Sequence, residues 1–366
     1  AEAYKAGAAL VDVIWTDDAL TLARYQHAPR VQARRGGSPG SWRSCRAAER
    51  EDAVLCVRAE DPDLLSGQDP DLVTVARRAE AETLRRFNEL RDKGHVNWCI
   101  IAPAIPAWAR GVFPGEPQEQ AVAKLWDAVF RATRADLPDA LDVWREHVDN
   151  LARWSAHLNE RRYSAIRLRG PGTDLTVGLP ERHVWKSGQF PMHDGHRYVA
   201  NMPTEEVFTM PHKDRVDGFV SSTKPLNYGG VTIDGIRVSF KDGRITEATA
   251  TQGEDVLRKL IETDEGSHRL GELALVPDSS PISQSGILFK HTLFDENAAS
   301  HIAIGRSYRA TIEGGEGMSL DELAAAGAND SLLHVDWMIG SREVDVDGIR
   351  ADGSSEPVMR GGEWTF

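Results

Sequence analysis

The spacing of apolar residues changes near Tyr163, and this change limits the folds open to the chain. Before it, apolar runs of strand length alternate with segments of helical spacing, which is typical of a mainly parallel sheet covered by helices. After it, short alternating runs are separated by Gly, Pro, Asp and Asn, as in sheets of closely spaced strands. We therefore expect an α/β N-terminal domain over residues 1–163 and a β-rich α+β domain over residues 164–366.

The first part contains three apolar runs that predict strands, at residues 9–15, 53–59 and 97–109. The last of these runs into a Pro-rich loop. Helical spacing separates or follows the strands, at residues 71–93, 118–134 and 138–161. The opening AEAYKAG resembles the end of a helix that closes at Gly7, so we expect part of that element to precede Ala1.

One segment of the first part has a different composition. Residues 30–50 are rich in arginine and contain Glu49 as their only acid, although the whole chain has a net charge of -13. The segment lacks apolar periodicity and predicts a flexible basic loop. Trp42 is its only aromatic residue, so it is a weak candidate for nucleic-acid contact. A local error in the reading frame is the alternative explanation.

The second part reads as a series of strands, with runs such as SAIRLRG, TDLTVGL and GELALVP. In VSFKDGRI, the pair Asp242 and Gly243 stands between two apolar runs. An Asp-Gly pair in this position is a strong indication of a hairpin with a two-residue turn.

Composition excludes several classes of protein. Hydrophobic residues make up 41% and charged residues 27%, as in globular proteins, and no apolar run approaches the ~20 residues of a membrane-spanning helix. The acidic excess argues against an extended phosphate-binding surface, so we expect neither a nucleic-acid nor a membrane partner. Three cysteines at irregular spacing and the lack of a signal-peptide pattern at the start suit a reducing, cytoplasmic environment.

Polar residues with metal-binding chemistry interrupt the apolar strands of the second part. In SLLHVDWMIGS, His334 and Asp336 are two residues apart, so both point to the same face of a strand. Burying an imidazole with a carboxylate is costly unless the two pair or bind a cation. By itself this spacing leaves a hydrogen-bonded core pair as the alternative to a metal site.

Further upstream, the run HIAIG places His301, Ala303 and Gly305 on one strand face. Asp295 is expected to cap a short helix before it, with Glu296 in the first turn. Tyr308 follows and is either a packed aromatic residue or a functional hydroxyl.

Two glutamates stand directly before or within apolar strand-like runs: Glu206 in NMPTEEVFTMP and Glu272 in LGELALVP. A glutamate entering a core strand is rarely there for stability. Two Glu, two His and one Asp form the mixture of oxygen and imidazole ligands expected for Zn, Co or Mn, and are enough for two adjacent ions.

Six strings of the second part resemble the signature segments of the M29 metallo-aminopeptidases, in the same order. They are GTDLTVGLP, NMPTEEVFTMP, TKPLNYGG, LGELALVP, LFDENAASHIAIGRSY and HVDWMIG. The resemblance covers essentially the whole chain and is stronger in the second half. It implies an α/β domain followed by a β-rich metal domain, a homodimer and a large internal cavity. It weakens over residues 30–50, and implies that about one helix and one strand precede Ala1.

The resemblance also implies roles for individual residues. It places metal ligands at Glu206, Glu272, His301, His334 and Asp336 and a catalytic tyrosine at Tyr308. Glu272 would also serve as the general base. The implied cofactors are two divalent metal ions per chain.

The function expected from this resemblance is removal of single N-terminal residues from short peptides by a water that two metal ions activate. Glu205 could bind the free α-amine, or could be an outward-facing neighbour of Glu206. The alternatives are a mononuclear iron ring-cleaving dioxygenase of related fold, a non-catalytic metal-stabilised binding protein, and an inactive metal-binding homologue.

Overall fold

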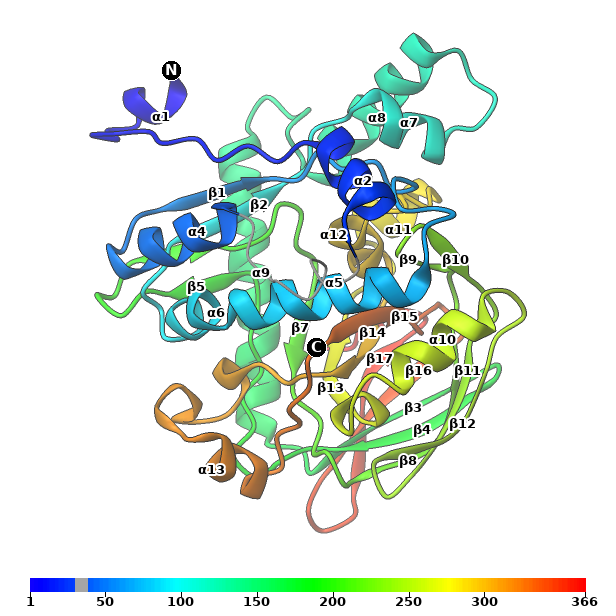
Figure 1. Ribbon diagram of the computed structural model, residues 1–366. Coiled ribbons are helices and arrows are strands. Elements are labelled where there is room, and N and C mark those ends of the chain that lie inside the picture. Colours follow the sequence, from blue (N-terminus) through cyan, green and yellow to red (C-terminus); the bar gives the residue numbers. More distant parts are fainter. Residues whose placement is uncertain (30–38) are drawn as a thin grey trace.

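The computed structural model describes residues 1–29 and 39–366, and it combines helices with two main antiparallel sheets (Figure 1). The first nine residues of the predicted basic loop, 30–38, lie outside the described residues. Most helices before residue 163 lie at one end of the molecule, and the two large sheets lie at the other (Figure 1). Among the described residues, no helix has both the length and the apolar character to cross a bilayer.

Strands β1 (Val54–Val57) and β2 (Trp98–Ile101) form a parallel pair in the N-terminal part. This agrees with the parallel pairing predicted for these two runs. The helices of this part are α1 (Glu2–Lys5), α2 (Asp18–His27), α4 (Pro39–Glu49), α5 (Pro70–Thr83), α6 (Arg85–Asp92), α7 (Pro106–Val112), α8 (Gln118–Ala132) and α9 (Ala140–Arg161). The three predicted helical segments are therefore confirmed, with the first one divided at Leu84.

The strand predicted at residues 9–15 is wrong. These residues form no strand, and their side chains are exposed, with Leu10 at 80% and Trp15 at 86%. A short apolar run becomes a strand only where a sheet edge offers hydrogen bonds, and among the described residues β1 pairs with β2 alone. The apolar character of the run is visible in the sequence, but the absence of a neighbouring strand is not.

The loop predicted over residues 30–50 is wrong in its second half, where α4 begins at Pro39 and ends at Glu49. Proline is well tolerated at the first position of a helix, where its missing N–H has no partner to lose. Contacts with α5 and α6 stabilise this helix despite its weak apolar periodicity.

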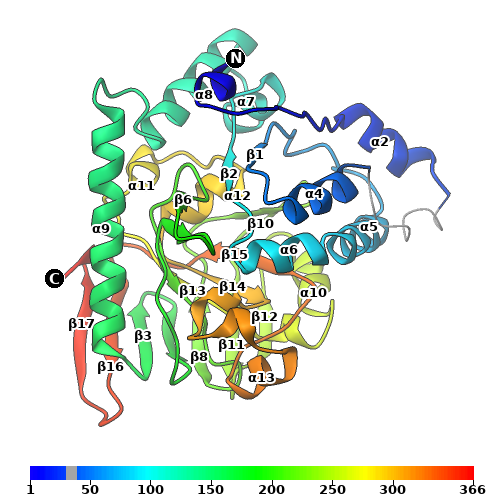
Figure 2. The ribbon, with the colours of Figure 1, turned by 90° about the vertical axis from the view of Figure 1, so that its left-hand side faces the viewer.

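The larger sheet has eight antiparallel strands in the order β12-β11-β8-β4-β3-β16-β17-β18. Their bounds are β3 (Ala165–Gly170), β4 (Thr173–Gly178), β8 (Val216–Ser221), β11 (Arg237–Lys241), β12 (Arg244–Thr249), β16 (Asp345–Ile349), β17 (Ser355–Arg360) and β18 (Glu363–Trp364). Helix α9 runs along one side of the molecule beside β3, β16 and β17 (Figure 2). Its buried Leu151 and Leu158 join the main core.

The second sheet has four antiparallel strands in the order β15-β14-β13-β7. They are β7 (Val207–Thr209), β13 (Leu270–Leu275), β14 (His301–Gly305) and β15 (His334–Met338). One face of this sheet packs Leu273, Ile302 and Trp337 into the same apolar core as the larger sheet. The opposite face is therefore free to carry polar residues.

Short elements complete the second part. They are β5 (Gln189–Pro191), β6 (Arg197–Val199), β9 (Leu226–Tyr228), β10 (Val231–Ile233), α10 (Glu254–Ile261), α11 (Pro281–Ser285), α12 (Thr292–Asp295) and α13 (Leu320–Ala325). The β5–β6 hairpin is important for the site because it forms part of a cavity wall.

The predicted hairpin at Asp242-Gly243 is confirmed, since β11 and β12 pair across these two residues. Both turn residues have positive φ, 49° for Asp242 and 78° for Gly243. A Cβ on Gly243 would stand 1.8 Å from the carbonyl oxygen of Lys213. Glycine is needed here for space as well as for backbone conformation.

We expect Gly243→Ala to destabilise the protein more than Gly353→Ala. Gly353 also lies in a hairpin turn of the larger sheet with positive φ, but a Cβ there would meet nothing within 4 Å. Gly353→Ala should therefore cost only the left-handed strain of about 1 kcal/mol, and Gly243→Ala roughly 1–3 kcal/mol more. Midpoints of denaturant unfolding compare the two variants, and equal midpoints would contradict the close contact at Gly243.

Candidate metal centre

The four-stranded sheet brings all five predicted metal ligands to one place. His334 and Asp336 lie on β15, His301 lies on β14, Glu272 lies on β13, and Glu206 directly precedes β7. In the register, Asp336 and Glu272 both oppose Ala303, and His334 opposes Gly305. Paired residues share a sheet face. The predicted common face of His334 and Asp336 is therefore confirmed, as is that of His301, Ala303 and Gly305, and the pairing shows that these two faces are the same.

A bulge in β13 decides where Glu272 points. The register shifts between Leu270 and Glu272, at Gly271. A Cβ on Gly271 would stand 2.4 Å from the carbonyl oxygens of Gly305 and Arg306, so only glycine fits. The small residues Ala303 and Gly305 then leave room on this face for the longer ligand side chains around them. Sequence alone does not reveal this bulge.

Glu272 lies between the two histidines. Its Oε1 is 3.7 Å from His301 Nε2, and its Oε2 is 3.6 Å from His334 Nε2. His301 Nε2 also lies 3.0 Å from Glu206 Oε2, and His334 Nε2 lies 3.5 Å from Asp336 Oδ1. The five side chains thus form two groups of three that share Glu272: one with Glu206 and His301, the other with His334 and Asp336.

Backbone carbonyls orient both imidazoles. His301 Nδ1 is 3.1 Å from the carbonyl oxygen of Ala299, and His334 Nδ1 is 2.7 Å from that of Arg306. A carbonyl oxygen only accepts, so each Nδ1 carries the proton and each Nε2 faces the carboxylates. This is the arrangement that holds a metal-binding histidine in the correct tautomer.

Three carboxylate oxygens of the cluster are buried and accept no hydrogen bond from the described part of the chain: Glu206 Oε2, Glu272 Oε2 and Asp336 Oδ1. The approach of His301 to Glu206 brings the atoms close without the alignment of a hydrogen bond. Buried polar atoms are normally satisfied, and an unsatisfied carboxylate oxygen is especially costly. The ligand set therefore fits divalent cations, which bind such oxygens directly.

Burial and neighbouring charges shift the pKa values of Glu272, His334 and His301. Burial raises the pKa of Glu272 to about 7. Burial by itself would lower the pKa of His334, but the carboxylates of Asp336 and Glu272 and the carbonyl of Arg306 together outweigh it, and the pKa of His334 rises to about 9. Desolvation likewise opposes charge on His301, yet contacts with Glu206 and Glu272 raise its pKa well above the usual value. A metal ion bound at Nε2 would replace these protons as the compensating positive charge.

Tyr308 lies beside this cluster. Its ring centroid is 4.8 Å from that of His334, and it packs edge-on against Phe208. Burial, and then the negative charge of Glu272, raise the pKa of the Tyr308 hydroxyl. The hydroxyl therefore stays protonated at neutral pH and can donate a hydrogen bond.

The cluster opens into a cavity of about 380 Å³. Glu206, Glu272, His334, Asp336 and Tyr308 line one side of it. The other side is formed by residues before and within the β5–β6 hairpin, with an apolar surface from Trp98, Phe190, Pro191, Met192 and Tyr198. A cavity that joins polar groups to an apolar wall is typical of a small-molecule or peptide site.

Sequence reasoning missed Glu296 as a site residue. As expected, Glu296 opens a short helix after Asp295, the 3-10 helix Glu296–Ala298. The Asp295 side chain does not cap this helix, because it accepts bonds from the N–H groups of Phe289 and His291 instead. Glu296 lines the cavity. Burial, and then the charges of Asp336 and Glu206, raise its pKa well above the usual value. Sequence gave no signal that separates Glu296 from its polar neighbours Asp295 and Asn297.

Glu205 does not line the cavity, and it does not face outward either. Its side chain is 3% exposed and makes a bidentate ion pair with Arg134, including a bond of 2.9 Å from Arg134 Nη2. Glu205 is therefore neither an amine-binding residue of the cavity nor an outward-facing neighbour of Glu206, and both expectations are wrong. Its partner Arg134 follows α8, far away in the sequence, so the local pattern around Glu205 could not indicate the ion pair. The pair holds the backbone next to Glu206.

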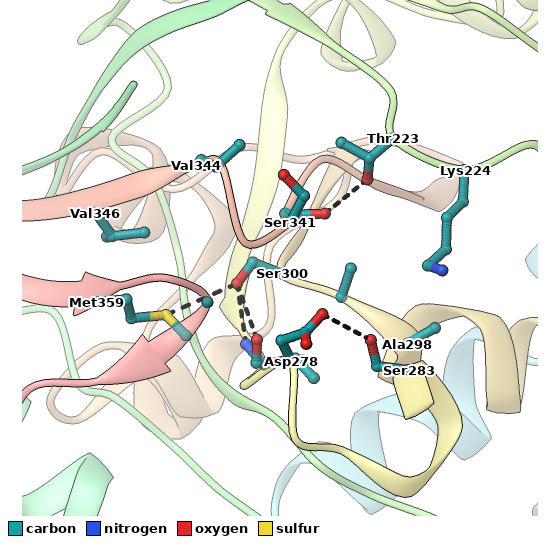
Figure 3. Close-up of a pocket in the computed structure, with 14 residues that line it drawn as sticks. Thr223, Lys224, Asp278, Ser283, Ala298, Ser300, Ser341, Val344, Val346 and Met359 are labelled. Carbon is teal, nitrogen blue, oxygen red and sulfur yellow. Dashed lines mark hydrogen bonds between the residues drawn. The ribbon is translucent and has the colours of Figure 1, made fainter. Parts of the chain in front are cut away.

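A second cavity of about 110 Å³ lies apart from this cluster, with Thr223, Lys224, Asp278 and Ser300 among its lining residues (Figure 3). Its polar side chains largely bond to the protein itself, as in the contacts of Thr223 with Gly340 and of Asp278 with Ser283. It contains no group of metal-ligand residues among those described. The larger cavity is therefore the candidate active site.

Comparison with known families agrees with this assignment. The model of the thermophilic metalloproteases (M29) matches residues 1–364. The chain belongs to this family. The resemblance seen in the sequence is thereby confirmed, and the M29 family implies that divalent metal is used by this chain.

The chain is also similar to named aminopeptidases over nearly its whole length. The chain is 45% identical to Aminopeptidase AmpS of Bacillus subtilis over 364 residues, which cover 100% of this chain and 89% of the relative. It is 45% identical to Aminopeptidase T of Thermus thermophilus, with 99% and 88% covered. The solved structure of wild-type AmpT from Thermus thermophilus superposes with a TM-score of 0.92 at 44% identity, covering 100% of this chain and 89% of that one.

We expect Arg134→Ala to lower the free energy of unfolding by about 3–5 kcal/mol, because it leaves the Glu205 carboxylate buried without a partner. Arg145→Ala is the control, since Arg145 pairs with Asp142 on an exposed helix surface and such pairs contribute little. Chemical denaturation of both variants provides the measurement. An Arg134 variant as stable as the Arg145 variant would show that the buried pair is not important for the fold.

Proposed function

We propose that this chain is a metal-dependent aminopeptidase that hydrolyses the N-terminal peptide bond of short peptides with two divalent ions. The observation that carries the proposal is the pair of ligand groups that share Glu272 and open into one cavity. Two ions bridged by a carboxylate are a common arrangement in hydrolytic metal sites. The relatives are named aminopeptidases, and this name supports the choice of peptide substrate.

In this proposal, Glu206, His301 and Glu272 hold one ion, and Glu272, His334 and Asp336 hold the other. The donors are imidazole nitrogen and carboxylate oxygen without thiolate, so Zn, Co and Mn all suit the site. When bound, such ions supply Lewis acidity that lowers the pKa of water and polarises the scissile carbonyl.

Glu272 is the proposed general base. Its carboxylate lies in the cavity wall within 3.7 Å of both histidines, where a group that accepts and releases protons can reach an attacking water. In the proposed reaction it accepts a proton from the attacking water and then gives one to the leaving amine. Its central place between the two histidines is compatible with metal binding and with proton transfer.

Tyr308 is the proposed donor to the oxyanion that forms as the carbonyl is attacked. Its protonated hydroxyl lies in the wall of the same cavity, beside His334. A fixed donor aimed at developing negative charge accelerates the reaction because it needs no rearrangement during the step.

Glu296 is the proposed partner of the free α-amine. It faces the cavity within the field of Glu206 and Asp336, where a bound ammonium group would offset the crowded negative charge. This role would explain why an aminopeptidase needs a carboxylate beyond its metal ligands. The apolar wall near Trp98 and Phe190 would then receive the side chain of the N-terminal residue.

The cavity lies between residues of both parts of the chain, which supports treating residues 1–163 and 164–366 as two domains that enclose it. Enclosure would admit short peptides and exclude folded proteins. A homodimer and a cytoplasmic location remain part of the proposal, since peptide hydrolysis in an enclosed site is compatible with both.

We expect Tyr308→Phe to lower kcat by about a hundredfold or more, since losing one oxyanion donor costs about 2.7–4 kcal/mol of barrier. Metal content should not change, because the ring still packs against Phe208. Steady-state kinetics and metal analysis on the same preparation test this. Turnover equal to that of the wild type would remove Tyr308 from the mechanism.

Metal removal should abolish release of leucine from a short unblocked peptide, and cobalt, zinc or manganese should restore it. The N-acetylated form of the same peptide should not be cleaved, because it lacks the charged amine that Glu296 would bind. Cleavage of both peptides would contradict exopeptidase action. No cleavage with two ions bound per chain would instead indicate an inactive metal-binding protein.

We expect Glu296→Gln to lower kcat/KM for unblocked peptides by roughly tenfold to a hundredfold, the effect of losing a hydrogen bond to a charged group. Glu316→Gln is the matched control, because Glu316 lines the same cavity but is not among the groups that shift the pKa of Glu296. A loss of the same size in both variants would show a general effect of cavity charge, and would remove the specific role of Glu296.

A further inference from the structure

A second group of metal-ligand residues lies outside the catalytic cluster, formed by Glu51, His95 and His193. We propose that these residues bind a structural zinc ion that joins the N-terminal part of the chain to the β5–β6 hairpin. The proposal does not rest on the peptidase activity, because the group shares no residue with the catalytic cluster.

The three side chains converge on one point. Glu51 Oε1 lies 2.8 Å from His95 Nδ1 and 3.0 Å from His193 Nε2. The centroids of the two imidazole rings lie 4.5 Å apart, and the ring planes are tilted by 34°. One ligand atom from each residue can be chosen so that all lie within 4.8 Å of one another.

These distances suit a tetrahedral zinc site. Zinc binds nitrogen and oxygen at about 2.0–2.2 Å, which places neighbouring ligand atoms roughly 3.3–3.5 Å apart. The Glu51 oxygen needs to move only a few tenths of an ångström from each nitrogen to reach that spacing, since it lies 2.8 Å from His95 Nδ1 and 3.0 Å from His193 Nε2. Two histidines and one glutamate form a known zinc-binding set, with the fourth position open to water.

The backbone brings these residues together from distant parts of the chain. Glu51 follows α4 with a left-handed φ of 59°, where the chain turns into β1. His95 follows α6 and Gly94, whose φ is 73°. The N–H of His193 donates a bond of 3.0 Å to the carbonyl oxygen of Gly94, and a Cβ on Gly94 would stand 3.1 Å from that nitrogen. This close backbone contact fixes His193 next to His95.

The side chains also have the access and charge that an ion requires. Their exposed fractions are 34% for His95, 38% for His193 and 46% for Glu51, so zinc can enter from solvent. Hydrogen bonds from His95 and His193 lower the pKa of Glu51, which keeps it a carboxylate. A hydrogen-bonded trio without any ion is the competing explanation, and it makes a different prediction for zinc content.

The position of this group gives the ion a structural consequence. Gly94 and His193 both line the cavity of about 380 Å³ into which the catalytic cluster opens. A bound ion would fix the hairpin that carries Phe190 and Met192 against the loop after α6. The site would thus hold two sides of the cavity wall at a set distance.

The test compares zinc content in the wild type and in His193→Gln, Glu51→Gln and His196→Gln. Each full-length protein is stripped with chelator, equilibrated in a zinc buffer of fixed free ion concentration, and analysed for zinc per chain. His196 is the matched control, because it lies in the same hairpin but pairs with Asp194 and is 83% exposed. The backbone bond to Gly94 is kept in every variant.

We expect the zinc content of the wild type and of His196→Gln to exceed that of His193→Gln and Glu51→Gln by one ion per chain. Zinc should also raise the thermal midpoint of His196→Gln more than that of His193→Gln. Equal zinc content in all four proteins would overturn the proposal and leave the trio as hydrogen bonds alone. Because only the difference between variants is used, the result does not depend on how many ions the catalytic cluster holds.

Discussion

Three carboxylates and two imidazoles share one buried face of a four-stranded sheet, and the rest of the structure is arranged around that constraint. Charges are not buried together without compensation. The protein supplies part of it through the backbone carbonyls that hold both Nδ1 atoms. The unsatisfied oxygens of Glu206, Glu272 and Asp336 suit positive charge from elsewhere, which the proposed metal ions would supply.

Apolar packing on the opposite face of the same sheet helps to offset the cost of burying these charges. Leu273, Ile302 and Trp337 alternate with the ligands and pack into the core shared with the eight-stranded sheet. The strands are therefore anchored by apolar packing and do not depend on the polar face for their position. A site on rigid strands keeps its ligand atoms in place before any ion binds.

The N-terminal part contributes access and shape rather than metal ligands to the catalytic cluster. Arg91, Lys93 and Trp98 of this part line the cavity. Because the wall is built from two parts of the chain, contacts between them set its dimensions, and the trio of Glu51, His95 and His193 lies at one such contact. Control of cavity shape and catalytic chemistry are thus separated in the structure.

The sequence by itself determined the strands that carry the ligands, the shared face of His334 and Asp336, and, through family resemblance, all five residues of the cluster. Local alternation and side-chain chemistry are encoded in short segments, so they can be read without a fold. Only the tertiary structure decided the bulge that aims Glu272, the exposure of residues 9–15, the Arg134 pairing of Glu205 and the place of Glu296. Each of these depends on residues far apart in the chain, and no local pattern specifies which distant group will supply the partner.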